Sequence, residues 1–273
     1  MAAIITDSTS DLTLAQVEAL GVTMLSLRVN FGEESYLDKR EITSEGFYEK
    51  LVAARETPTT SLLNPDDFIA AFDEHPDEEI VVVTLSQKLS GTYQSAVIAK
   101  ETLGRTDIYI VDSGSVCAAL GLLVQRAAEL NRAGLGAARI ADALEALAEK
   151  SRLIGVTETL TYLVRGGRLG KVSGYVGGML NIKPVLMISE GEVKPVLKAR
   201  GEKDAFEKIR ALVFEKYPID TSMPVAFACA AGGEARLQSF MQTLGLTGPV
   251  SAIGSVVGTH AGPGTIIISY FEK

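Results

Sequence analysis

Residues 79–93 read EIVVVTLSQKLSGTY, and this stretch passes from a predicted strand through a turn into a predicted helix. Ile80–Leu85 is a continuous apolar, β-branched run, typical of a strand that is buried on both faces of a parallel sheet. Small polar residues follow, and Ser90 is a natural N-cap for the next helix. The stretch therefore predicts one strand-and-helix unit of an α/β fold.

The same alternation extends in both directions from this unit. Thr13 with Gln16 fits a capping box, and Asn64-Pro65 fits a helix start. The alanine-rich stretch 118–148 predicts two helices divided at Gly134–Gly136. We expect an N-terminal lobe over residues 1–150, built on a parallel sheet, with strands at 4–6, 23–30, 79–86 and 108–112 and helices at 13–20, 44–55, 66–73 and 91–103.

The pattern changes after Ser151. Two strand-like runs flank Glu190-Gly191-Glu192, which predicts a hairpin. We expect a C-terminal lobe of mixed α/β structure over residues 151–273, with strands at 152–157, 186–189, 193–197, 225–230, 251–256 and 265–271 and helices at 202–217 and 234–244.

Composition restricts the possible functions. The chain has 273 residues, is 47% apolar and carries a net charge of −8, which disfavours nucleic acids and anionic membranes as partners. The apolar runs are too short to cross a bilayer, and no secretory signal is visible. Cys117 and Cys229 are far apart, without metal or redox spacing. We expect a soluble, cytoplasmic protein with two buried, reduced thiols.

Three polar segments follow predicted strands or precede predicted helices. Asp7–Asp11 lies at the carboxyl end of the first strand, where ligands bind in open α/β sheets, but the same residues also form capped turns. Thr59-Thr60-Ser61 by itself favours ordinary loop chemistry. Ser90 opens a helix whose free N–H groups suit an anion, although the residues by themselves slightly favour an ordinary cap.

His260 lies in the most unusual stretch, Gly258–Gly264, which contains three glycines and a proline. A connecting loop rarely needs such a composition around a histidine, so we favour a functional role for this side chain. The other histidine, His75, lies in an acidic turn and is expected to be solvated.

Motifs for several chemistries are absent from the sequence. It contains no phosphate-binding loop, no dinucleotide-binding glycine motif after a strand, no nucleophile elbow and no metal-ligand spacing. We therefore assign no catalytic residue, no metal and no cofactor. An enzyme in which Ser90 and His260 act on an acyl or phosphoryl group stays open as the alternative, since the sequence permits this pairing without arguing for it.

These segments together resemble the DegV family of bacterial fatty-acid-binding proteins. The resemblance covers the full length in seven matches that keep their order. They are residues 6–12 (TDSTSDL), 58–61 (PTTS), 89–95 (LSGTYQS), 162–170 (YLVRGGRLG), 180–186 (LNIKPVL), 198–201 (KARG) and the His260 loop.

The resemblance implies a two-lobed α/β fold that encloses an acyl chain in a tunnel, with its carboxylate at the lobe interface. It also implies that a fatty acid kinase is the partner, which serves phospholipid synthesis. The carboxylate contacts it implies are Thr60, Ser90 and His260, with Ser61 and Ser86 close by. Gln87 and Leu62-Leu63 depart from the family pattern beside this region.

Two further sets of residues complete the expected site. The acyl tunnel candidates are Met179, Leu180, Ile182, Val185, Leu186 and Met187, for which plain hydrophobic core is the alternative. Arg168 and Lys171 are candidates for contact with the kinase, for which a solvated basic turn is the alternative.

Overall fold

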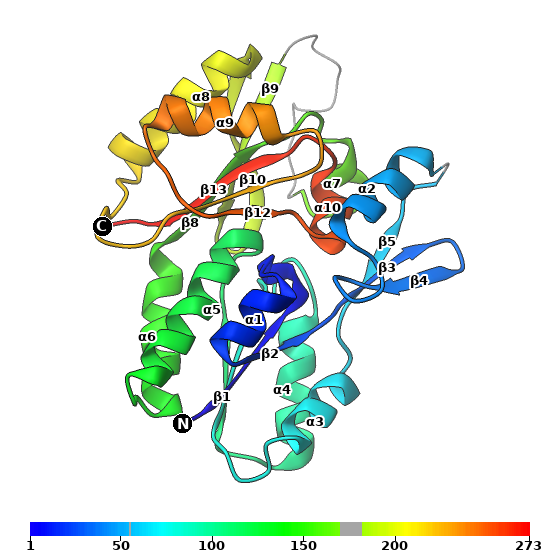
Figure 1. Ribbon diagram of the computed structural model, residues 1–273, viewed down its shortest axis with the longest axis vertical. Helices are drawn as coiled ribbons and strands as arrows, with labels where there is room; N and C mark the ends of the chain where they lie inside the picture. The colour runs from blue at the N-terminus through cyan, green and yellow to red at the C-terminus, as the bar shows by residue number, and fades with distance from the viewer. Residues whose placement is uncertain (55, 170–181) are drawn as a thin grey trace.

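The computed structural model describes residues 1–54, 56–169 and 182–273. Figure 1 shows the N-terminal half below and the C-terminal half above, with the β3–β4 hairpin extending to one side. The fold is mixed α/β, as the sequence predicts. The residues in these ranges form a four-stranded, a six-stranded and a small three-stranded sheet.

The first sheet is parallel and has the order β2-β1-β6-β7. Val81 and Val83 of β6 pack with α5 and α6, whereas Ile80 and Val82 pack with α3 and α4. Successive side chains of a strand point to opposite faces, so one apolar run serves two helical layers. The elements are β1 (Ala3–Asp7), β2 (Val22–Leu25), β6 (Ile80–Thr84), β7 (Ile108–Asp112), α1 (Leu14–Leu20), α3 (Pro65–Asp73), α4 (Thr92–Leu103), α5 (Cys117–Arg132) and α6 (Ala137–Lys150).

The second sheet is mixed and has the order β10-β9-β8-β13-β11-β12. The predicted hairpin is present, and Glu190 and Gly191 turn it with φ values of 55° and 78°. Helices α8 and α9 share one core with this sheet. The elements are β8 (Ser151–Val156), β9 (Ile182–Ser189), β10 (Glu192–Arg200), β11 (Ala226–Cys229), β12 (Val250–Ala252), β13 (Ile266–Phe271), α7 (Thr161–Arg165), α8 (Gly201–Ala211), its π-helical extension η2 (Leu212–Lys216) and α9 (Glu234–Leu244).

The predicted strand at 23–30 is wrong as a single element. The chain leaves the parallel sheet after β2 and enters a separate antiparallel sheet of order β4-β3-β5. Between the two, the Leu27 N–H donates to Ser8 Oγ at 3.2 Å instead of continuing a strand ladder. This sheet comprises β3 (Arg28–Phe31), β4 (Glu34–Leu37) and β5 (Thr59–Ser61), and α2 (Ser44–Ala53) lies between β4 and β5 in the chain.

The predicted strand at 251–256 is also wrong, and the glycine loop after it is confined to residues 262–264. The strand ends at Ala252, and α10 (Ser255–Ala261) follows, so that His260 lies on a helix. Gly258 allows this helix to pack closely, because a Cβ atom at that position would lie 2.5 Å from Tyr48 Oη. The small residues therefore serve a tightly packed helix.

The two halves share a hydrophobic core. All strands of the parallel sheet precede Lys150 and all strands of the six-stranded sheet follow it, yet Ile4, Leu120 and Ile267 belong to one buried cluster. Helix α5 contacts β1 and β6 as well as β11 and β13. The division into domains at residues 150 and 151 stays a prediction.

The remaining expectations concern the thiols and the membrane. Cys117 and Cys229 are buried and free, as predicted. In the described ranges, the structure has no helix of the length and hydropathy that a bilayer crossing needs.

Candidate functional site

A cavity of about 170 Å³ is lined by residues of both halves. Most of its wall is apolar, and polar side chains come from the start of α4, from β5 and from α10. The lining residues of the N-terminal half are Thr9, Leu27, Thr60, Ser61, Leu62, Leu85, Leu89, Ser90, Gly91 and Val116. Those of the C-terminal half are Leu153, Gly155, Thr157, Leu163, Arg168, Leu186, Met187, Ile188, Val193, Val256, Val257, His260, Ala261, Thr265 and Ile267.

Four of the five predicted carboxylate contacts line this cavity: Thr60, Ser61, Ser90 and His260. They come from segments far apart in the sequence, which supports the idea that the motifs form one site. The fold brings them together because β5 and α10 pack against each other.

His260 is joined directly to one of these residues. Its Nε2 lies 3.0 Å from Thr60 Oγ1, a distance typical of a hydrogen bond across the two halves. Its Nδ1 is buried and has no partner within the described residues. Gly166 lies so close to the ring that a Cβ there would be 2.1 Å from Nδ1. The imidazole is therefore fixed in position while one ring nitrogen is left unused.

Burial lowers the pKa of His260 from 6.5 to about 4, and the nearby positive charge of Arg168 acts in the same direction. The imidazole is therefore neutral at pH 7. A neutral imidazole carries one N–H donor and one acceptor nitrogen. With the hydroxyls of Thr60, Ser61 and Ser90, it forms a set of uncharged groups that can hydrogen-bond a carboxylate.

Ser90 lies just before α4, but the N-cap position belongs to Gly91. The Ser90 hydroxyl is 3.0 Å from Thr92 Oγ1 and accepts the Thr92 N–H at 3.4 Å. The prediction of Ser90 as the N-cap residue is therefore wrong by one position, although its hydroxyl still lies at the start of the helix and lines the cavity.

Ser86 is not among the lining residues. Its hydroxyl donates to the Gly191 carbonyl at 2.8 Å and accepts the Lys88 N–H at 3.2 Å. A Cβ on Gly191 would lie 2.6 Å from Ser86 Oγ, so the β9–β10 turn is pressed against this hydroxyl. In this arrangement Ser86 connects the two halves and does not face the cavity.

Arg168 is half-buried and lines the cavity. Its Nε donates to the Leu89 carbonyl at 3.1 Å and its Nη1 to the Gly166 carbonyl at 2.7 Å. These bonds fix the guanidinium beside the polar residues, which does not fit the alternative of a solvated basic turn. Lys171 lies outside the described residues.

The tunnel candidates divide between two environments. Leu186 lines the cavity, whereas Val185 is buried in the core with α8 and α9, and Met187 belongs to that core and also lines the cavity. The alternation of side chains along β9 explains the difference between Val185 and Leu186, which face opposite sides of the sheet. Ile182 is half-buried and does not line the cavity, and Met179 and Leu180 lie outside the described residues.

Sequence reasoning did not find most of the apolar wall. Gly155 gave one usable signal, because a glycine inside a strand often marks a close approach of another chain segment. A Cβ there would lie 2.6 Å from the Ile266 carbonyl oxygen. Thr9 gave a second usable signal in the sequence, because it follows the carboxyl end of β1.

The Asp7–Asp11 segment is a capped turn that also contributes one cavity residue. Asp7 Oδ1 accepts the Thr9 N–H at 3.0 Å, and Asp7 Oδ2 accepts the Leu85 N–H at 2.8 Å. Burial raises the pKa of Asp7 from 3.8 to about 6. Asp7 therefore joins the ends of β1 and β6, while Thr9 faces the cavity.

The contacts of His260 give no sign of an activated nucleophile. Its Nε2 bonds Thr60, and no carboxylate orients its Nδ1 in the part of the chain that the structure describes. In the same part of the chain, no group of three or more His, Cys, Asp or Glu side chains could hold a metal ion.

Comparisons with known proteins agree with this geometry. A model of the family described as "Uncharacterised protein, DegV family" matches residues 1–273. A DegV domain-containing protein of Halalkalibacterium halodurans is 36% identical over 279 residues, which cover 99% of each chain.

Solved structures give the same result. One described as "Fatty Acid Binding of a DegV family Protein from Thermus thermophilus" has a TM-score of 0.89 and 31% identity, covering 100% of this chain and 99% of the other. A Streptococcus pneumoniae structure has a TM-score of 0.84 and 24% identity over 100% of both chains, which shows a shared fold. That protein is described as a fatty acid kinase B3 protein loaded with linoleic acid.

Proposed function

Because this chain belongs to the DegV family, we propose that it binds one long-chain fatty acid and carries it without chemical change. The observation that carries the proposal is the cavity itself, in which Thr60, Ser90 and His260 form a polar group beside an apolar wall. A fatty acid has the same division, with one carboxylate and a long apolar tail. Fatty acid binding by the Thermus thermophilus protein supports this proposal.

The two parts of the ligand would contribute differently to binding. Each buried methylene stabilises the complex by about 0.8 kcal/mol, and association costs offset a large part of the total. The tail, in contact with residues such as Leu186 and Met187, therefore supplies affinity. The hydroxyls of Thr60, Ser61 and Ser90 and the neutral imidazole of His260 would orient the carboxylate.

We further propose that the bound carboxylate is presented to a fatty acid kinase. Arg168 supports this, because its guanidinium is held by two carbonyls and lines the cavity with the proposed carboxylate contacts. Lys171 is a second candidate contact on sequence grounds alone. The description of the Streptococcus pneumoniae protein, which has the same fold, motivates the choice of partner.

Mass spectrometry of the purified protein, first native and then denatured, tests the carrier function. We expect a native mass that exceeds the polypeptide by one fatty acid, which is released on denaturation. His260→Gln should weaken retention, whereas the same exchange at His75, the only other histidine, should not. Bare polypeptide that also takes up neither oleate nor palmitate would contradict the proposal.

Phosphorylation of the loaded protein tests the partner. A fatty acid kinase should form acyl phosphate from loaded wild type, and Arg168→Gln should abolish this while fatty acid stays bound. Arg165→Gln is the matched control, because Arg165 is an exposed arginine on α7 that contacts Thr57. Equal phosphorylation of both variants would refute the role of Arg168.

The alternative of a Ser90–His260 enzyme has its own measurement. Turnover of activated esters or acyl phosphates that disappears in His260→Gln would favour it over the carrier.

A further inference from the structure

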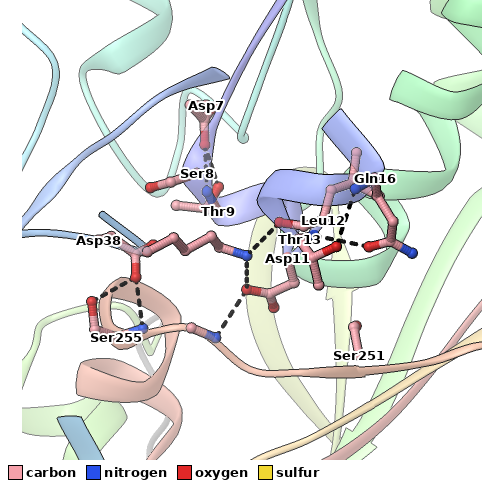
Figure 2. A network of polar contacts seen from close by, with 12 residues as sticks. Asp7, Ser8, Thr9, Asp11, Leu12, Thr13, Gln16, Asp38, Ser251 and Ser255 are labelled. Carbon is pink, nitrogen blue, oxygen red and sulfur yellow. Dashed lines mark hydrogen bonds and ion pairs between the residues drawn. The ribbon is translucent and has the colours of Figure 1, made fainter. Parts of the chain in front are cut away.

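Helix α10 carries His260 and begins on two buried carboxylates of the N-terminal half. Asp11 Oδ1 accepts the Gly254 N–H at 2.9 Å. Asp38 Oδ1 accepts the Ser255 N–H at 3.0 Å and the Ser255 hydroxyl at 2.7 Å. Figure 2 shows both carboxylates directed at the chain where it enters this helix. The free N–H groups of a helix start are thus satisfied by side chains from a distant part of the sequence.

The surroundings make these carboxylates costly to bury. Asp11 is 3% and Asp38 is 1% exposed. Lys39 Nζ lies 3.5 Å from Asp11 Oδ1, and it also donates to the Leu12 carbonyl at 3.0 Å. The Oδ2 atoms of both aspartates are buried without a partner in the described residues. Such an arrangement persists only where the surrounding structure requires it.

Close packing restricts which residue can occupy position 254 at the start of α10. A Cβ on Gly254 would lie 3.0 Å from Asp11 Oδ1 and 3.2 Å from Asp38 Oδ1, so a larger residue would displace one or both carboxylates. One turn further on, Gly258 is packed against Tyr48 in the same way. The helix is therefore fixed along its length and not only at its first residue.

The opposite end of α10 meets the site. His260 Nε2 bonds Thr60 Oγ1 at 3.0 Å, so the helix is held between the carboxylate of Asp38 and the hydroxyl of Thr60. Ser255 and His260 lie about one and a half turns apart, at a rise of about 1.5 Å per residue. A shift of the helix start is transmitted to the imidazole because the intervening backbone is hydrogen-bonded.

We propose that Asp38, together with Asp11, is a positioning residue that fixes His260 in the orientation in which it meets the ligand. The effect on ligand binding rests on the proposed function of fatty acid binding, whereas the effect on the imidazole does not.

The test compares Asp38→Ala with Asp38→Asn. Alanine removes the acceptor for both Ser255 donors, whereas asparagine keeps an oxygen in its place. The first readout is the pH titration of the His260 imidazole by NMR in a His75→Gln background, where it is the only imidazole because the chain has two histidines. The second readout is the affinity for oleate.

Asp220 provides a matched control. Its Oδ1 accepts the Ser222 N–H at 2.9 Å and the Ser222 hydroxyl at 2.6 Å, the same pair of bonds that Asp38 makes. Asp220 precedes β11 and is not a lining residue of the cavity. Asp220→Ala thus loses an equivalent Asp–Ser contact without touching α10.

We expect Asp38→Ala to shift the His260 signals and their titration and to weaken oleate binding by about tenfold or more. Asp38→Asn should restore most of both, and Asp220→Ala should change neither. If Asp38→Ala does not fold, Ser255→Ala should give smaller shifts in the same direction.

Folded Asp38→Ala, or Ser255→Ala in its place, with wild-type His260 signals and affinity would overturn the proposal, even if the melting temperature fell. The failure of the proposed function looks different. In that case the wild type itself takes up no oleate, and the His260 titration alone still decides whether Asp38 positions the ring.

Discussion

Replacing His260 by glutamine should change how stability depends on pH. In the folded protein, burial lowers the pKa of His260 from 6.5 to about 4. Between these two values, the unfolded chain binds a proton at this residue that the folded protein does not. Stability contributed by the neutral, buried imidazole is therefore fully present above pH 6.5 and is lost as the pH falls toward 4.

The magnitude follows from the size of the shift. Each pKa unit corresponds to about 1.4 kcal/mol of differential stabilisation. The His260 ring is only partly shielded from water, so we take a value below the full shift. The difference in unfolding free energy between wild type and His260→Gln should fall by about 2–3 kcal/mol from about pH 7.5 to about pH 4.5.

Urea unfolding of wild type and His260→Gln across this pH range measures the difference in their unfolding free energies. Taking the difference cancels the titrations that the two proteins share. His75→Gln is the control for loss of a histidine as such, because His75 lies in the acidic turn beside Glu78, with 2.9 Å between Nδ1 and Oε1. A difference between wild type and His260→Gln that stays constant with pH would refute the account. It would mean that His260 titrates alike in the folded and unfolded chains.

Four other substitutions have defined outcomes, with Thr59→Val as a control. Thr60→Val should weaken oleate binding about tenfold by removing one hydroxyl. Thr59→Val, at an exposed neighbouring position, should not weaken it. Equal losses of affinity in the two variants would contradict the role of Thr60 as a ligand contact. Val185→Ala should lower the unfolding free energy by about 1–3 kcal/mol, read by urea unfolding, with unchanged affinity for oleate. Leu186→Phe should shift preference toward shorter acids, read by titration with fatty acids of different length. Burial raises the Asp7 pKa to about 6. As the pH falls from about 7 to about 4, the unfolding free energy of the wild type should therefore rise by about 3 kcal/mol relative to that of Asp7→Asn. A fall in this difference would contradict the prediction.

Much of the N-terminal half follows from its sequence because local and tertiary preferences agree there. Ile80–Thr84 is an apolar, β-branched run, and helices cover both faces of its sheet, as such a run requires. Thr13 and Gln16 form the capping box that their spacing predicts. The two alanine-rich helices are divided at residues 133–136, where the glycines stand.

The elements that were predicted wrongly depend on contacts with distant residues. The run at 23–30 reads as one strand, but Ser8 binds the Leu27 N–H and the chain changes sheets there. The run at 251–256 is rich in apolar residues and predicts a strand. The buried carboxylates of Asp11 and Asp38 hold its second half as a helix start, and periodicity contains no information about them.

The candidate site shows the same division. Ser90 and His260 could be found because polar or glycine-rich stretches at strand and helix ends are unusual, and the resemblance linked them to Thr60. That the side chains of Val185 and Leu186 lie on different faces of β9 was predictable, since neighbouring residues of a strand point to opposite sides of a sheet. The orientation of Ser86 away from the cavity was not predictable, because its hydroxyl bonds a carbonyl of the C-terminal half.

The distribution of charge explains how an acidic protein can hold an anion. The Asp7 carboxylate is directed at backbone N–H groups, and those of Asp11 and Asp38 at the start of α10. The polar groups that line the cavity are instead hydroxyls, a neutral imidazole and the guanidinium of Arg168, which is the one cation among the described lining residues. Fixed donors in a region of low dielectric stabilise a carboxylate strongly. The net charge of −8 therefore does not oppose binding inside the cavity.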